Sequence, residues 1–285
     1  MAGLKKANQS NDLEKVNSEL DAEEVRHLDL DLPMTDEDGV VRDVPLLAGY
    51  IDEDGTLYDT FSYREMNGKD EEAISKADVR SNPAKLANVL CERCVVAIGT
   101  ITKKEVGVVK WGKIIRSMLG GDIDYMMFKI RELSKGTEVE FRHTCPSCGH
   151  ELVTIMNTDE FEIKPFMGER DIHFELIRGY RDRHGDKHMT GVLSLPTGYD
   201  REATVPSIKK NPAMATTVLL SRLMKFDDGA VVSQNLVAEM SLRDRDMLEK
   251  LLKENTFGID TTVDNLICDN CGAVIHGQVG ESNFF

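Results

Sequence analysis

Four cysteines with the spacing of zinc ligands are the residues of this chain best suited to chemistry. They lie in two short runs, Cys145-Pro-Ser-Cys148-Gly and Cys268-Asp-Asn-Cys271-Gly. In such a turn, called a zinc knuckle, both sulfurs point at one metal while the glycine lets the backbone turn beneath it. Tetrahedral zinc needs two knuckles. The sequence therefore predicts one Zn2+ per chain, bound by all four cysteines.

The predicted zinc is structural rather than catalytic. Four thiolates saturate the ion and leave no position for a water or a substrate. A redox Cys-x-x-Cys would need an electropositive helix N-terminus to lower the pKa of its thiol, whereas the short strand-like runs around both knuckles indicate hairpins. His143, His150 and His276 flank the knuckles and stay open as replacements for a cysteine ligand.

The segment between the knuckles contains an internal repeat. Motifs return in the same order at offsets between 123 and 130 residues, and this indicates two tandem copies of one supersecondary unit, each ending in half of a metal site. The recurring motifs are Arg42-Asp-Val with Arg170-Asp-Ile, Gly68-x-Asp-x-Glu-Ala with Gly198-x-Asp-x-Glu-Ala, Asn82-Pro-Ala with Asn211-Pro-Ala, and the knuckle at Cys145 with that at Cys268.

A third cysteine pair, Cys91 and Cys94, lies inside a helical pattern, and no further pair is left to complete a metal site around it. Leu220 and Leu223 stand at the equivalent positions of the second copy. Because a buried free cysteine behaves as a small hydrophobic residue, we predict that this pair packs in the core.

Each copy reads as a β-hairpin followed by helices and a knuckle. The predicted fold class is therefore α+β, a tandem duplication in which the two knuckles form one zinc-ribbon-like site. The expected hairpin strands are Val44–Tyr50 with Leu57–Met66 and Ile172–Tyr180 with Thr190–Leu195. The expected helices begin at Pro83 and Pro212 and continue through Ile98 and Phe226, followed by Asp122–Leu133 and Ser241–Leu252.

The predicted domain division has three parts. Residues 1–39 form an acidic, flexible leader, residues 40–165 the first repeat with its knuckle, and residues 166–285 the second repeat with its knuckle. Apolar residues at helical spacing in the leader leave open a short helix that docks on a partner.

Composition narrows the class of protein. The chain has 285 residues, of which 41% are hydrophobic and 30% charged, as expected for globular domains. Its net charge of −15 argues against a nucleic-acid partner. No apolar run is long enough to span a membrane. All six cysteines lie in Cys-x-x-Cys pairs, which in an unsecreted chain favours metal binding over disulfides.

No catalytic signature accompanies the cysteines. The sequence has no Gly-x-Ser-x-Gly elbow, no phosphate-binding loop of the Gly-x-x-x-x-Gly-Lys type and no His-Glu-x-x-His helix. The charged run from Arg181 to His188 falls on a predicted hairpin tip, so we interpret it as a solvated turn. We therefore expect a protein that is not an enzyme and has no catalytic residues.

Several of these motifs together resemble one known family. They are Arg64-Glu-Met-Asn-Gly-Lys-Asp-Glu-Glu72, the helix start Asn82-Pro83, the helix containing Asp122-Ile-Asp-Tyr125 and Ile130-Arg-Glu-Leu133, and the first knuckle. This set resembles the baseplate hub and hub-assembly proteins of contractile-tailed (T-even-like) bacteriophages, over residues 40 to 285.

The resemblance implies a non-enzymatic structural or assembly protein of the phage tail baseplate. Its partners would be other tail and baseplate proteins, with no nucleic acid and no membrane. It would reside in the virion, or in the host cytoplasm during assembly. The alternative function is a zinc-ribbon adaptor in transcription or nucleic-acid handling, and the oligomeric state stays open.

Overall fold

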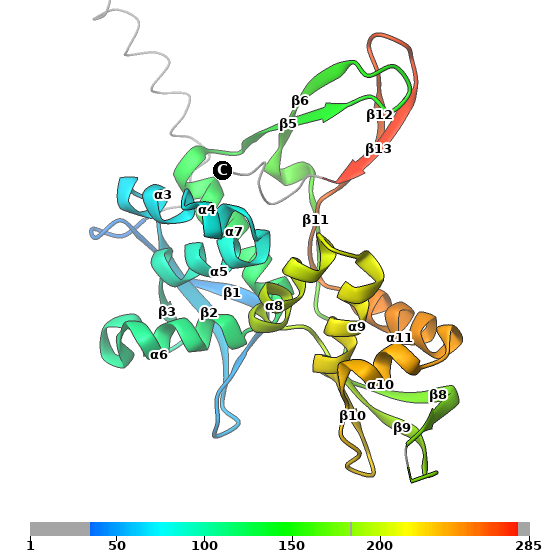
Figure 1. Cartoon of the computed structure of the whole chain (residues 1–285). Helices are drawn as coiled ribbons and strands as arrows, with labels where there is room; N and C mark the ends of the chain where they lie inside the picture. Colours follow the sequence, from blue (N-terminus) through cyan, green and yellow to red (C-terminus); the bar gives the residue numbers. More distant parts are fainter. Residues whose placement is uncertain (1–34, 183, 279–285) are drawn as a thin grey trace, which may run out of the picture.

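The structure is a computed structural model that describes residues 35–182 and 184–278. The predicted leader lies outside the described residues except for residues 35–39, and the C-terminal Phe284 and Phe285 also lie outside. Two helix-and-sheet halves lie side by side, and a pair of hairpins projects together from one end of the molecule (Figure 1). We call residues 40–165 the first half and residues from 166 onward the second half.

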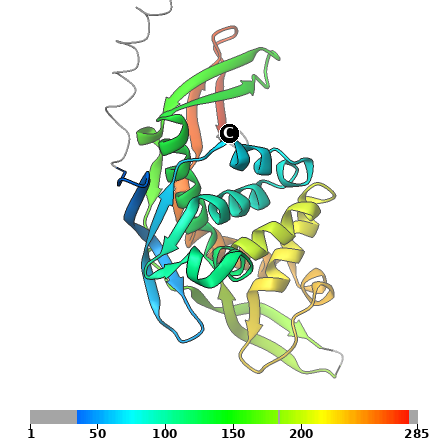
Figure 2. The same cartoon turned by 90° about the vertical axis from the view of Figure 1, so that its left-hand side faces the viewer.

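The first half is built on a four-stranded antiparallel sheet in the order β1-β2-β3-β4. Its elements are β1 (Val40–Ile51), β2 (Leu57–Arg64), α3 (Gly68–Ile74), α4 (Ala77–Arg80), α5 (Pro83–Cys94), β3 (Val95–Ile98), β4 (Ile101–Thr102), α6 (Lys103–Ser117) and α7 (Gly120–Lys135). Helices α5 and α7 pack on each other and against the sheet, as Figure 2 shows from the side.

The second half is built on a three-stranded antiparallel sheet in the order β10-β9-β8. Its elements are β8 (Asp171–Arg181), β9 (Lys187–Ser194), α8 (Gly198–Ile208), α9 (Pro212–Leu223), β10 (Met224–Phe226), α10 (Gln234–Glu239) and α11 (Leu242–Glu254). In both halves a hairpin is joined in the sheet by a short strand that directly follows a helix.

Three small antiparallel pairings lie at the ends of the two halves, and one of them, β7 with β11, joins the halves. Strand β5 pairs with β6 and β12 with β13 to form the two projecting hairpins, while β7 pairs with β11 beneath them (Figure 1). These elements, together with the short 3-10 helix η1, are β5 (Glu138–Thr144), β6 (Glu151–Asn157), η1 (Thr158–Glu160), β7 (Glu162–Lys164), β11 (Gly258–Asp260), β12 (Thr262–Ile267) and β13 (Val274–Gln278).

The turns of the two main hairpins, β1–β2 and β8–β9, contain the same pattern of hydrogen bonds. In the β1–β2 turn the Asp52 side chain accepts the backbone N–H groups of residues 54 and 56, and Gly55 N–H donates to the Asp52 carbonyl. Asp182 and Gly185 repeat this arrangement in the β8–β9 turn. Aspartate favours such a turn because its side chain bonds to the backbone two residues on, and both glycines have positive φ.

Helix starts also correspond between the halves. Asn82 and Asn211 cap α5 and α9, each with proline as the first helical residue. Asp70 and Asp200 are the third residues of α3 and α8, and both complete capping boxes.

A buried aspartate joins each hairpin to a later helix. Asp122 and Asp244 are the third residues of α7 and α11, and both are fully buried. One carboxylate oxygen of each accepts two consecutive backbone N–H groups from the first hairpin strand. The donors are Leu47 and Ala48 for Asp122, and Ile177 and Arg178 for Asp244.

Each half has its own hydrophobic core, and a smaller cluster lies between them. The first core includes the single tryptophan, Trp111, which is 1% exposed, and Phe161, whose ring packs edge-on against Phe128. The second core lies between the β8–β9 hairpin and the helices α9, α10 and α11. The cluster between the halves is centred on Leu119, Leu195 and Phe257.

Two sequence predictions about helix length are wrong. Helix α5 ends at Cys94, and Ala97 and Ile98 lie in β3; likewise α9 ends at Leu223, and Phe226 lies in β10. Ile98 and Phe226, which continued the helical pattern, are strand residues that face the first and the second core, so helical periodicity did not separate the helix from the strand.

The interpretation of the run from Arg181 to His188 as a solvated turn is correct for most of the turn but wrong for His188. This ring is 8% exposed, stacks on Tyr180, and has its Nδ1 2.6 Å from an Asp228 carboxylate oxygen. That hydrogen bond raises the pKa of His188.

Candidate metal centre

The four cysteines of the two knuckles meet at the tips of the projecting hairpins. All four Sγ atoms lie within 4.8 Å of one another, although the knuckles are more than 100 residues apart in sequence. The Sγ atoms of Cys145 and Cys271 are 3.7 Å apart, as are those of Cys148 and Cys268. Cys145 and Cys268 are buried, whereas Cys148 and Cys271 are exposed.

The backbone of each knuckle folds in the same way. The N–H of the first cysteine donates to the carbonyl of the residue after the glycine, 2.8 Å away in the first knuckle and 2.9 Å in the second. The glycine N–H donates back to the first cysteine's carbonyl. Gly149 and Gly272 have φ of +73° and +72°, a backbone conformation that is strained for residues with a side chain. Glycine is therefore required where each turn passes beneath the sulfurs.

The surroundings favour a thiolate at one of the exposed sulfurs. The Asn270 amide donates to Cys148 Sγ over 3.5 Å and, with a backbone hydrogen bond at His150, lowers the pKa of Cys148 to about 6. At Cys271 a backbone hydrogen bond from Ala273 acts to lower the pKa, but the adjacent sulfurs, first among them that of Cys148, and partial desolvation raise it to about 12. Packed thiols cannot all ionise unless a cation shares their charge.

The sulfur positions fit a tetrahedral metal ion. Zinc–sulfur bonds of about 2.3 Å place the sulfurs of a tetrahedral site about 3.8 Å apart. The two 3.7 Å contacts match this edge and are far longer than a disulfide bond of about 2.0 Å. An all-sulfur donor set suits zinc or an iron–sulfur centre. The four cysteines thus form a cluster whose geometry is compatible with a bound metal ion.

Of the histidines near the knuckles, His143 and His150, whose side chains the structure describes, are not part of this cluster. His150 instead has its Nε2 3.1 Å from a carboxylate oxygen of Asp269, a contact that joins one knuckle to the other. His143 lies in β5, and the side chain of His276 is outside the described set.

Cys91 and Cys94 are fully buried in the first core, away from the four-cysteine cluster. Cys91 Sγ lies 3.6 Å from the carbonyl oxygen of Ile123, and burial raises the pKa of Cys94 to about 12. The prediction that this pair packs in the core is confirmed.

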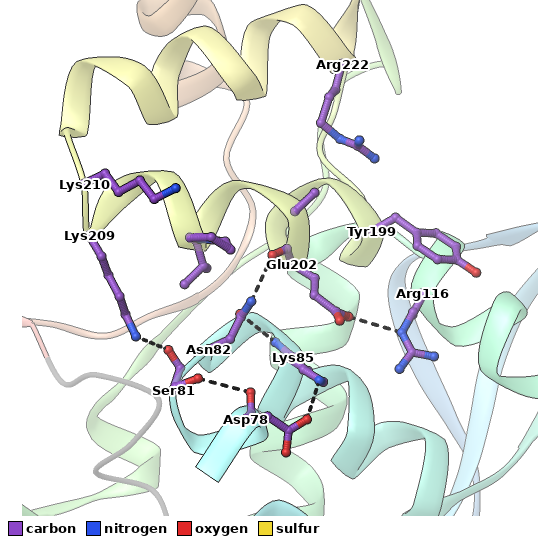
Figure 3. A pocket seen from close by; sticks show the side chains of 13 residues that line it. Asp78, Ser81, Asn82, Lys85, Arg116, Tyr199, Glu202, Lys209, Lys210 and Arg222 are labelled. Atoms are coloured by element: carbon purple, nitrogen blue, oxygen red, sulfur yellow. Dashed lines mark hydrogen bonds and ion pairs between the residues drawn. The ribbon is translucent and has the colours of Figure 1, made fainter. Parts of the chain in front are cut away.

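A polar cavity of about 690 Å3 lies between the halves, lined by α4, α5, α6, α8 and α9 (Figure 3). Its side chains mostly hold the halves together. Asn82 Nδ2 donates to the Glu202 carbonyl, Lys209 Nζ donates to the Ser81 carbonyl, and Arg116 pairs with Glu202. Sequence reasoning did not identify this cavity, because the cations that line it come from separate segments. Since an ion pair and two side-chain-to-carbonyl hydrogen bonds cross it from one half to the other, its arrangement is that of an internal interface.

Residues 52–285 match the family model described as T4 bacteriophage base plate protein. The chain belongs to this family. The match begins directly after β1 and includes the rest of the first half, the second half and both knuckles, and it confirms the resemblance to T4-like baseplate proteins drawn from the sequence. Comparisons with curated proteins and with solved structures give no match.

Family membership locates this baseplate protein in the tail baseplate of the virion and indicates a structural rather than an enzymatic protein. Its contacts are therefore with other phage tail proteins. Among the described residues, no helix combines the length and apolar character needed to cross a membrane.

Proposed function

We propose that this chain is a non-enzymatic structural or assembly protein of the hub region of the baseplate, and that it acts through protein–protein contacts. Its membership of the baseplate family over residues 52–285 is the observation that carries the proposal. The resemblance of its Gly-x-Asp-Glu-Glu run and its first knuckle to hub and hub-assembly proteins supports the finer placement in the hub.

We further propose that the two halves are copies of one unit, with boundaries at residues 40–165 and 166–285 after a leader of residues 1–39. The matching turns, helix caps and buried aspartates support a duplication, because several independent hydrogen-bond patterns recur in the same order. An ion pair recurs as well: Arg93 binds Asp70 in the first half, and Arg222 binds Asp200 in the second.

The metal of the cluster is a single structural Zn2+, bound by Cys145, Cys148, Cys268 and Cys271. It cross-links the ends of the two copies, since each contributes one knuckle. Sites of this type contribute on the order of 10 kcal/mol of apparent binding free energy, which is comparable to the stability of a whole domain. The zinc therefore fixes the projecting hairpins as one rigid surface for neighbouring subunits.

The test is a phage that lacks this gene, complemented in infected cells by the wild-type chain or by the double variant Cys148→Ser with Cys271→Ser. We expect the uncomplemented phage to accumulate tails without complete baseplates, the wild type to restore them, and the variant to restore few. Mass spectrometry of purified particles and of assembly intermediates then locates the chain. Normal baseplates in its absence would contradict the proposal.

A further inference from the structure

The first half has an apolar face that the second half covers. Leu47 and Ala48 of β1 lie beside the first turn of α7, and Leu195 and Phe257 pack against them. Gly121 permits this contact, because a Cβ there would lie 2.6 Å from the Phe257 ring. The backbone takes part too, since Gly120 N–H donates to the Pro196 carbonyl over 2.9 Å.

In the part of the chain that the structure describes, nothing covers the same face of the second half. The hydrogen bonds of the buried aspartates align Leu47 with Ile177, and the first turn of α7 with that of α11. Ile177 is 58% exposed, and Leu242, which stands in the position of Gly120, is 74% exposed. The large apolar side chains of Ile177 and Leu242 therefore face solvent, whereas the equivalent positions of the first half, Leu47 and Gly120, are packed against the second half.

Two positive charges border this face. Arg178 and Arg243 replace Ala48 and Gly121 of the first half, and both are exposed. Within residues 35–182 and 184–278 neither arginine forms a side-chain ion pair. In the first half, Arg170 donates to the carbonyls of Ala48 and Gly49. No described side chain does so for the carbonyls at Arg178 and Gly179.

We propose that Ile177, Arg178, Leu242 and Arg243 form a docking surface for an apolar segment, flanked by carboxylates, of another baseplate protein. The way in which Leu195 and Phe257 cover the first half indicates what such a segment presents: an apolar side chain and a backbone carbonyl for the Leu242 N–H. The arginines select acidic flanks by charge complementarity. This inference rests on the proposed duplication and baseplate role.

A second copy of this chain is a poor occupant. Its own segments that cover the first half are already buried against that half, with Leu195 4% and Phe257 9% exposed. Within residues 35–182 and 184–278, an additional copy therefore has no free equivalent of these covering segments to offer unless the halves separate.

The surface is tested by site-specific photocrosslinking in infected cells. The full-length chain carries Leu242→p-benzoylphenylalanine and complements the gene-deficient phage. The control places the same residue at Val109, which is 79% exposed on α6. We expect an adduct from position 242, and not from position 109, with one peptide of another tail protein that contains apolar residues beside Asp or Glu.

Charge variants test the acidic flanks. Arg178→Glu with Arg243→Glu should lower the adduct yield about tenfold, whereas Arg178→Lys with Arg243→Lys should leave it within about twofold, since long-range attraction depends on the sign of the charge. An adduct only with a second copy of this chain, an adduct with a peptide lacking acidic flanks, or a yield unaffected by the Glu variants would overturn the proposal.

The readouts separate this inference from the proposed function. If the chain is found in particles or assembly intermediates but position 242 forms no adduct, the docking surface is wrong and the baseplate role stands. If the chain is absent from both and its loss leaves baseplates normal, the proposed function fails as well.

Discussion

Asp122 and Asp244 hold equivalent positions in the two halves, each as the third residue of a helix whose carboxylate accepts two N–H groups from the first strand of a hairpin. Fully buried carboxylates are rare unless they are paired or hydrogen-bonded. Each aspartate sets the position of its helix relative to its hairpin. The position of the helix in turn directs the following chain toward its knuckle.

The stability of the first half should depend on the protonation of Asp122. Burial raises the pKa of this carboxyl to about 6, against the opposing effect of the Ala48 and Leu47 N–H groups. Its unfolded value is about 3.9. Between about pH 4 and pH 6 the folded state therefore binds more protons than the unfolded state, and the free energy of unfolding falls as the pH rises.

Asp122→Asn keeps an acceptor oxygen and removes the titration. When the pH is lowered from 7 to 4, we expect the unfolding free energy of the wild type to rise by about 2 kcal/mol relative to that of the variant. Urea unfolding at both pH values measures it, with the exposed Asp246→Asn as control. Parallel pH profiles for wild type and Asp122→Asn would contradict the assignment.

The corresponding ion pairs of the two halves should contribute unequally to stability. Asp70 is fully buried and binds both Arg64 and Arg93; burial acts to raise its pKa, but these hydrogen bonds hold it at about 2. Asp200 binds Arg222 with its side chain 15% exposed. Asp70→Asn should cost about 3 kcal/mol of unfolding free energy and Asp200→Asn about 1 kcal/mol. Urea unfolding measures both losses. Equal losses of unfolding free energy in the two variants would show that the burial of the aspartate does not determine how much its ion pair contributes.

Gly121 should be intolerant of a side chain. A Cβ at this position lies 2.6 Å from the Phe257 ring and backbone, whereas at Gly120 the nearest atom belongs to the flexible Arg201 side chain. Although alanine favours helices, Gly121→Ala should destabilise the protein by about 2 kcal/mol, and Gly120→Ala by less. Thermal unfolding checks both, and equal stability of the two variants would contradict the close packing of the halves.

The buried thiols of α5 should be dispensable for metal binding. Replacing Cys91 and Cys94 with alanine should cost about 1 kcal/mol each through lost packing, and metal content should not change. Metal analysis of the purified double variant provides the test. A lower metal content than in the wild type would return this pair to the candidate ligands.

The sequence predicted the parts of the fold that depend on local chemistry. The aspartate-glycine turn of the first hairpin, the Asn-Pro helix starts and the knuckle glycines each require a particular residue at a particular backbone conformation, and all were placed correctly. The meeting of the knuckles followed from the number of thiols that a tetrahedral metal needs.

Features set by tertiary packing could not be predicted. Ala97 continues a helical pattern yet lies in β3, because pairing with β2 determines the end of α5. His188 lies on a hairpin that reads as solvated, yet Asp228, 40 residues away, pairs with it. The burial of Asp122 likewise depends on backbone donors more than 70 residues away.

The most direct test of the account is native mass spectrometry of the purified full-length chain, with metal counted per polypeptide and free thiols titrated after unfolding. We predict one zinc per chain, lost in the Cys148→Ser and Cys271→Ser double variant, with Cys91 and Cys94 still titratable. Two zincs per chain, half a zinc per chain in a dimer, or no metal with paired disulfides would contradict a single zinc that joins the two halves.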